Sequence, residues 1–249
     1  MTTAARRLLT FVLICVAAAV VFVRLGFWQL SRLHQRRARN AVIAARLVMP
    51  RVPITTLAAD SASRLRRATL TGEPDYAHEI VIASRSHEGS PGVNLLTPVR
   101  VAGHDTVILV NRGWVYAPDG VAVNGERWRE RSRTFAGYAE LMPNNDPRAS
   151  VLRQRPLTLA QIAHSPIAHA LPYPVSSLYL VATVVDSATA VADQVARLPE
   201  PVLDEGPHLG YAIQWFAFAA IALVGAVVIV RVTRAAERAR AGNGRLSSP

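Results

Sequence analysis

The chain has 249 residues, of which 51% are hydrophobic, so it has room for one domain of ordinary size together with apolar segments that could cross a membrane. Its formal net charge of +11 comes from arginines that cluster beside those apolar segments and form no recognisable recognition helix or RNA-binding motif, which argues against a nucleic-acid partner. The single cysteine, Cys15, lies in the first apolar segment, which excludes a disulfide or a thiolate metal site from the rest of the chain.

The first apolar segment, residues 8–30, contains one charged side chain, Arg24. An arginine near the end of a membrane helix can extend its guanidinium to the interface, so this segment is predicted to span a membrane after a cytoplasmic N-terminus at residues 1–7. A cleavable signal peptide with Ala17-Ala18-Ala19 as its cleavage site is the alternative. The apolar run continues past these alanines, which favours a retained helix.

Residues 31–206 carry the soluble mass and are predicted to lie outside the cytoplasm. Their first part, residues 31–46, is rich in arginine and alanine, so it is predicted to continue the first helix as a polar stalk that ends at Pro50 and Pro53. Six short segments follow that are rich in β-branched residues and are separated by turn signals. The six predicted strands are residues 68–71, 79–84, 93–101, 106–111, 134–141 and 178–185.

Six short strands with little helix between them predict an antiparallel sheet or a small barrel. Residues 93–101 and 106–111 are expected to pair as a hairpin through Gly103-His104-Asp105. Residues 157–163 are predicted to form a short helix, and residues 187–197 fit either a helix or a loop.

The second apolar segment, residues 207–230, has no charged residue after His208 and is long enough to cross a hydrocarbon core of about 30 Å. Acidic residues precede it and five arginines lie within residues 231–249, so the positive-inside rule predicts that this tail is cytoplasmic. Arginines just beyond the first span argue the other way, although a long loop can be translocated regardless of its charge. The predicted class is an α+β membrane protein with two transmembrane helices flanking an extracytoplasmic, mainly antiparallel β domain.

Four sequence blocks stand out at the two apolar segments and in the strands between them. The blocks are Leu25-Gly26-Phe27-Trp28-Gln29-Leu30-Ser31-Arg32, Gly92-Val93-Asn94-Leu95-Leu96-Thr97-Pro98-Val99, Val107-Ile108-Leu109-Val110-Asn111-Arg112-Gly113-Trp114-Val115 and Pro207-His208-Leu209-Gly210-Tyr211-Ala212-Ile213-Gln214-Trp215-Phe216. In this order they resemble the Surfeit locus protein 1 family of cytochrome c oxidase assembly factors, and the resemblance runs from about residue 8 to about residue 230. It implies a two-span protein of the inner (plasma) membrane that helps to mature oxidase subunit I, with haem a as its cargo. The implied partners are subunit I, the haem a synthesis machinery and membrane lipids.

His208 suits the function that the resemblance implies. A neutral imidazole is a common axial ligand of haem iron, and its place at the mouth of a membrane helix lets an apolar macrocycle lie in the bilayer. Tyr211 and Trp215 follow on the same side of the helix and are predicted to form an aromatic wall of this haem site. The alternative is an interfacial belt in which the three side chains bind no ligand.

Two further groups are candidates for docking a partner. Asn111-Arg112-Gly113-Trp114 ends a strand with a guanidinium and an indole, which are common in binding hot spots. The alternative, which is favoured, is that Trp114 plugs the sheet and Arg112 pairs with a nearby acid. Trp28 and Arg32 lie one helical turn apart at the membrane edge, where anchoring in the interface is the favoured interpretation.

The sequence lacks the histidine spacing of zinc hydrolases, a nucleophile elbow, a phosphate-binding loop and a dinucleotide fingerprint. We therefore predict that the chain is not an enzyme. Two other functions stay open: a membrane-anchored chaperone that stabilises a subunit I intermediate without binding haem, and a membrane-anchored hydrolase or sensor. A hydrolase would need a nucleophile–base pair that the sequence does not show.

Overall fold

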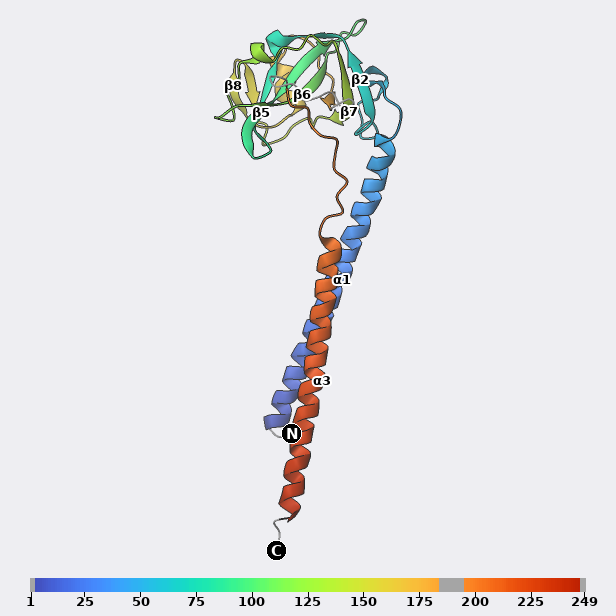
Figure 1. Cartoon of the computed structure of the whole chain (residues 1–249), viewed down its shortest axis with the longest axis vertical. Coiled ribbons are helices and arrows are strands. Elements are labelled where there is room, and N and C mark those ends of the chain that lie inside the picture. The colour runs from blue at the N-terminus through green and yellow to red at the C-terminus, as the bar shows by residue number, and fades with distance from the viewer. Residues whose placement is uncertain (1–2, 184–194, 247–249) are drawn as a thin grey trace. The chain divides into compact units, whose positions relative to one another are not determined.

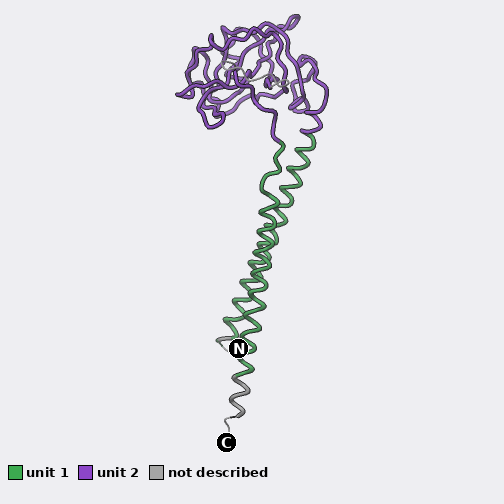
Figure 2. Tube along the Cα trace, viewed as in Figure 1, with its two compact units in different colours: residues 1–42, 203–249 green, residues 43–202 purple. Residues whose placement is uncertain are grey.

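The structure is a computed structural model that describes residues 3–183 and 195–246. The chain divides into two compact parts (Figure 2). Residues 1–42 and 203–249 form one part, which we call the helical unit, and residues 43–202 form the other, which we call the β domain.

The helical unit consists of two long helices. Helix α1 (Thr3–Leu47) and helix α3 (His208–Leu246) run side by side (Figure 1). Each contains a stretch that is long and apolar enough to cross a membrane. Helix α1 continues without a break through the arginine-rich residues 31–46, so the predicted polar stalk is confirmed.

The two helices pack antiparallel along a seam with a seven-residue repeat. The less exposed positions on each helix alternate in steps of four and three residues, as in a coiled coil. Phe22 stacks on Trp215 with ring centroids 5.7 Å apart. A Cβ at Gly26 would lie 2.6 Å from the Phe216 ring, so glycine permits this close approach. We call the following residues the helix seam: Cys15, Ala19, Phe22, Gly26, Gln29 and Leu33 on α1, and His208, Ala212, Trp215, Ala219, Ala222 and Ala226 on α3.

The β domain is built on a ten-stranded sheet within the described residues. Its order is β1-β2-β7-β10-β6-β5-β4-β9-β8, and β3 pairs with β5. Figure 1 labels β2, β7, β6, β5 and β8 of this sheet. In the part of the β domain that the structure describes, four short helices connect or flank the strands: η1 (Ile54–Thr56), η2 (Tyr76–His78), η3 (Gly125–Trp128) and α2 (His164–Ala170). The strands are β1 (Val52–Pro53), β2 (Arg67–Thr71), β3 (Glu73–Pro74), β4 (Ile80–His87), β5 (Ser90–Arg100), β6 (Ile108–Tyr116), β7 (Thr134–Leu141), β8 (Val151–Gln154), β9 (Leu157–Leu159) and β10 (Leu178–Ala182).

All six predicted strands occur, as β2, β4, β5, β6, β7 and β10, and the predicted β5–β6 hairpin is confirmed. The sheet, however, is mixed, because β1–β2, β4–β9 and β6–β10 pair in parallel. Strands β1, β3, β8 and β9 were missed since they are two to four residues long.

The predicted helix at residues 157–163 is wrong. Residues 157–159 form β9, which is buried between β4 and β8, and the helix begins only at His164. A strand edge of β4 needs a hydrogen-bonding partner, and this tertiary need overrides the local preference. Of the ambiguous segment 187–197, residues up to 194 lie outside the described residues, and Ala196 forms a bridge with Trp114.

Both faces of the sheet are covered. Alternate side chains of β6 and β10 enter two different core clusters, as the two-residue period of a strand requires. On β6, Leu109 belongs to one cluster, while Ile108 and Val110 belong to the other. The central strand β6 is therefore buried along most of its length, which decides the environment of Asn111 and Arg112.

Candidate functional site

His208 lies at the first position of α3, in the helix seam, and its side chain is half-buried. Its Nδ1 atom is 2.9 Å from Oε1 of Gln29 on α1. Gln29 is only 9% exposed, so the contact is largely shielded from solvent. Among the residues that the structure describes, Nε2 of His208 makes no hydrogen bond. The imidazole therefore has one engaged nitrogen and one that is open to a ligand.

The turn before His208 is held by the polar stalk of α1. Arg36 Nε donates to the carbonyl oxygen of Asp204 at 2.9 Å, and Arg37 forms two hydrogen bonds with the Glu205 carboxylate. The Arg37 guanidinium lowers the pKa of Glu205 through these bonds. Two of the arginines that opposed the predicted topology are thus engaged by the segment that leads into α3.

The structure separates the two aromatic residues that were predicted to accompany His208. Trp215 is half-buried in the helix seam, where it packs on Phe22 and Phe218. Tyr211 lies beside the seam and is 48% exposed. His208 and Trp215 therefore share the seam, whereas Tyr211 offers its ring to whatever surrounds the helices.

Trp28 and Arg32 lie on the outer side of α1. Trp28 is 54% exposed, and Arg32 donates to the Gln35 side chain. Neither residue belongs to the helix seam. An exposed tryptophan and arginine suit an interfacial anchor, and partner docking by the pair stays a prediction.

In the β domain, a β-bulge in β6 directs Arg112 inward. Leu95 pairs with Gly113 while Leu96 pairs with Asn111, so Arg112 is the extra residue of the bulge. Its side chain is 0% exposed. A guanidinium in such a place must be paired, because an isolated buried charge is strongly destabilising.

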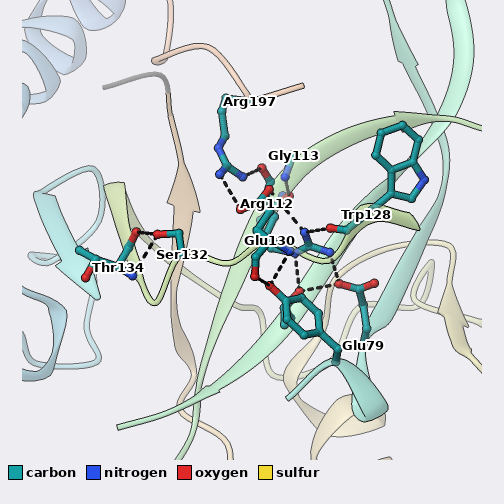
Figure 3. Close-up of polar contacts among 11 residues, drawn as sticks. Glu79, Arg112, Gly113, Trp128, Glu130, Ser132, Thr134 and Arg197 are labelled. Atoms are coloured by element: carbon teal, nitrogen blue, oxygen red, sulfur yellow. Dashed lines mark hydrogen bonds and ion pairs between the residues drawn. The ribbon is translucent and has the colours of Figure 1, made fainter. Parts of the chain in front are cut away.

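The buried guanidinium of Arg112 is surrounded by acceptors (Figure 3). Nε donates to Thr97 Oγ1 at 2.7 Å, and Nη1 donates to the Trp128 carbonyl oxygen at 2.5 Å. Nη2 donates to Glu79, whose carboxylate also accepts from Thr97 at 2.6 Å. Nη1 lies 3.5 Å from Glu130. We call this set, with Arg197, the arginine network.

Arg197 extends the network to the chain that follows residues 184–194, which lie outside the described residues. Its guanidinium donates to the Arg112 carbonyl oxygen at 2.6 Å and to Glu130 at 2.7 Å (Figure 3). Ala196 exchanges two backbone hydrogen bonds with Trp114. Gly113 has φ +129°, and a Cβ there would lie 2.1 Å from the Ala196 oxygen, so only glycine allows this crossing.

These positions change the interpretation of the Asn111–Trp114 block. Arg112 and Asn111 are buried, and the Asn111 side chain accepts a hydrogen bond from the Gly113 amide. The structure therefore does not fit a docking role for these two side chains, and it supports the alternative of a buried ion pair. Trp114 remains partly exposed and contacts His87 and Tyr116.

The sequence analysis did not identify the partners of His208 and Arg112. Gln29 had a readable signal, because it falls in the seven-residue repeat that includes Phe22 and Gly26. Glu79, Thr97 and Glu130 lie far from Arg112 along the chain and gave no such signal. In the described part of the chain, no three His, Cys, Asp or Glu side chains converge to hold a metal ion.

The sequence profile of the SURF1 family matches residues 16–220, which include most of the helix seam and the β domain. The chain belongs to the SURF1 family. A SURF1-like protein of Rickettsia felis is 24% identical over 88% of this chain and 96% of its own length. An uncharacterized SURF1-like protein of Mycobacterium tuberculosis is 30% identical over 82% of this chain and 76% of its own length. Both alignments cover more than four fifths of this chain, and the resemblance seen in the four sequence blocks is confirmed.

Proposed function

We propose that this SURF1-family protein is a cytochrome c oxidase assembly factor that binds haem a through His208 and assists its insertion into subunit I. The observation that carries the proposal is the state of the His208 imidazole, which has one nitrogen held by Gln29 and the other free of hydrogen bonds within the described residues. Family membership agrees with a role in oxidase assembly.

The residues around His208 fit a haem carried as cargo. Neutral imidazole is a common axial ligand of haem iron. The exposed ring of Tyr211 can cover part of the macrocycle, and burial of apolar surface adds to the affinity. A single ligand from this chain suits a carrier, because a carrier has to release its cargo.

The proposed placement follows from charge and length. We propose that α1 and α3 cross the inner membrane, with the β domain outside the cytoplasm and the arginine-rich tail inside. The partners would be oxidase subunit I, the haem a synthesis machinery and membrane lipids. We expect no bond-making chemistry from the chain itself.

A second candidate function is a chaperone that stabilises a subunit I intermediate without binding haem. It is favoured by the aromatic group of Trp114, His87 and Tyr116 on the β domain. Tyr116 is 57% exposed, and partly exposed aromatic side chains are common at protein interfaces.

Complementation of a strain that lacks this gene separates the two functions. We expect His208→Ala to accumulate at normal abundance while the membranes contain oxidase with depleted haem a. Tyr116→Ala should leave haem binding by the factor intact. Full oxidase activity and haem content with His208→Ala would contradict haem transfer through His208 and support the chaperone function.

A further inference from the structure

We propose that Gln29 is the positioning residue of the haem site, because it fixes His208 in the tautomer whose Nε2 atom is the iron ligand. This inference rests on the proposed function. It concerns the hydrogen bond between the two helices at one end of the helix seam.

The chemistry of the contact sets the proton. Gln29 presents Oε1 to Nδ1 of His208 at 2.9 Å, and an amide oxygen only accepts hydrogen bonds. Nδ1 must therefore carry the hydrogen. A neutral imidazole has one N–H group, so Nε2 then has a free lone pair. Histidines that bind metals commonly donate their other N–H to an acceptor in this way.

The position of Gln29 favours the hydrogen bond to His208 over other contacts. It is 9% exposed and occupies a seam position, so its side chain has few alternative partners. Apart from Cys15, the other seam residues are apolar, and Gln29 and His208 form the polar pair of the seam. An unpaired amide in such a seam would be destabilising, which keeps the contact formed.

The Nε2 edge of His208 faces a residue without a side chain. Gly206 has φ +71°, a conformation that favours glycine. A Cβ at this position would lie 3.5 Å from Nε2 and 3.4 Å from Cδ2. The glycine therefore leaves open the edge of the ring at which a ligand bond to Nε2 would form.

Hydrogen bonds also fix the conformation of residues 204–206, which precede the His208 ring. Asp204 Oδ1 accepts from the Gly206 amide at 2.9 Å, and Asn40 donates to the Asp204 carbonyl oxygen at 3.0 Å. The first bond lies within the turn, the second comes from the stalk, and neither involves the imidazole. Different residues thus set the surroundings of the two ring nitrogens. Gln29 accepts the hydrogen bond of Nδ1, and the glycine in the turn at Gly206 leaves space beside Nε2.

The first experiment reads the tautomer without haem. Full-length protein labelled with ¹⁵N-histidine is studied by NMR in detergent at alkaline pH, in the range where the histidine signals no longer change with pH. The His208 signals are identified by their loss in His208→Ala. We expect a protonated Nδ1 and an unprotonated Nε2 in the wild type and in Gln29→Glu, and a mixture of both tautomers in Gln29→Leu. A His208 protonated on Nε2 in the wild type would overturn the inference.

The second experiment titrates the same proteins with haem a extracted from purified oxidase. Loss of a partner of a metal-binding histidine typically weakens binding by about ten- to a hundredfold, and we expect this of Gln29→Leu. Gln29→Glu should restore the affinity and lower the reduction potential below that of the wild type, because a carboxylate makes the imidazole a stronger donor. A helix-packing role alone would not move the potential in this direction.

Gln35→Leu is the matched control, since Gln35 is exposed on the same helix and bonds only to Arg32 among the described residues. It should leave affinity and potential unchanged. Failure of the inference and failure of the proposed function give different results. If the wild type binds haem through His208 but Gln29→Leu keeps its affinity and tautomer, Gln29 has no positioning role. If the wild type binds no haem, the proposed function fails whatever the tautomer.

Discussion

At the scale of single residues, Arg112 shows how a charged side chain can serve as part of a core. Its guanidinium is fully buried and joins β6 to Glu79, Thr97 and Glu130. Removal of one partner from such a network leaves the other charges buried and unpaired. The arginine therefore acts as a structural element of the β domain.

Arg112→Ala should lower the free energy of unfolding of the β domain by about 3–5 kcal/mol. The measurement is denaturant unfolding of the full-length protein in detergent, followed by tryptophan fluorescence. Arg148→Ala is the control, because Arg148 also pairs with a carboxylate but is 78% exposed. It should change stability by at most about 1 kcal/mol. Similar losses in both variants would show that the burial of Arg112 does not matter.

Asp75 provides a second residue-scale prediction, on pH. Burial favours its neutral form, but hydrogen bonds from Arg100, His78 and Tyr173 outweigh burial and lower its pKa in the folded protein. The folded state then releases the Asp75 proton more readily than the unfolded state. The stabilisation is complete above the unfolded pKa of about 3.9 and is lost as the pH falls through the folded pKa.

Asp75→Asn should therefore be less stable than the wild type at neutral pH, and the difference should shrink as the pH falls from about 5 toward 3. Unfolding midpoints over this range provide the test. A stability difference that stays constant with pH would show that the charge of Asp75 contributes nothing.

The sequence identified His208 as a candidate ligand but did not identify Gln29 as its partner. For Arg112, the favoured interpretation was an ion pair with a nearby acid, and the structure supports it. The pairing of Arg112 with an acid was the favoured alternative, yet the acids could not be named because Glu79 and Glu130 are brought to Arg112 only by the fold. Gln29 lies in the first sequence block, and its seven-residue spacing from Phe22 could have placed it on the packing face of α1. That spacing does not identify His208 as its partner.

At the scale of elements, the long helices and the main strands were readable because each has a strong local pattern. The short strands and the parallel pairings were not, since they depend on which strand edges remain open in the assembled sheet. The prediction of a helix at residues 157–163 was wrong for the same reason, because β9 forms there only to pair with the open edge of β4. The α3 side of the helix seam could have been predicted from a seven-residue repeat of small residues, namely Ala212, Ala219 and Ala226.

These alanines allow α1 and α3 to approach closely, as small residues do between membrane helices. Ala219→Leu should therefore disrupt the helical unit, because Ala219 is 4% exposed. Ala220→Leu is the matched control at the next, exposed position. The measurement is the temperature at which each protein aggregates in mild detergent. Equal values for both variants would contradict the proposed seam.

At the scale of the whole molecule, the chain has two apolar helices and one β domain, and the proposal assigns haem binding to the helical unit. The ion pair of Arg37 with Glu205 and the bond of Arg36 to Asp204 give these two stalk arginines a structural role. In the proposed topology, this role accounts for arginines beyond the first span that the positive-inside rule alone would place in the cytoplasm.

The proposed topology predicts opposite results from two reporter fusions. Alkaline phosphatase, which is active only outside the cytoplasm, should be active when inserted at the exposed Asn144 and inactive when fused to the C-terminus. Activity at the C-terminus and none at Asn144 would reverse the orientation of the β domain.

The central claim is that His208 binds the haem cargo, and the visible spectrum of the purified protein tests it most directly. Wild type, His208→Ala and the control His104→Ala, which changes an exposed turn residue, are purified from cells that make haem a. We predict equal protein yields, bound haem a in the wild type and the control, and much less in His208→Ala. Equal haem content and an unchanged spectrum in His208→Ala would contradict the claim.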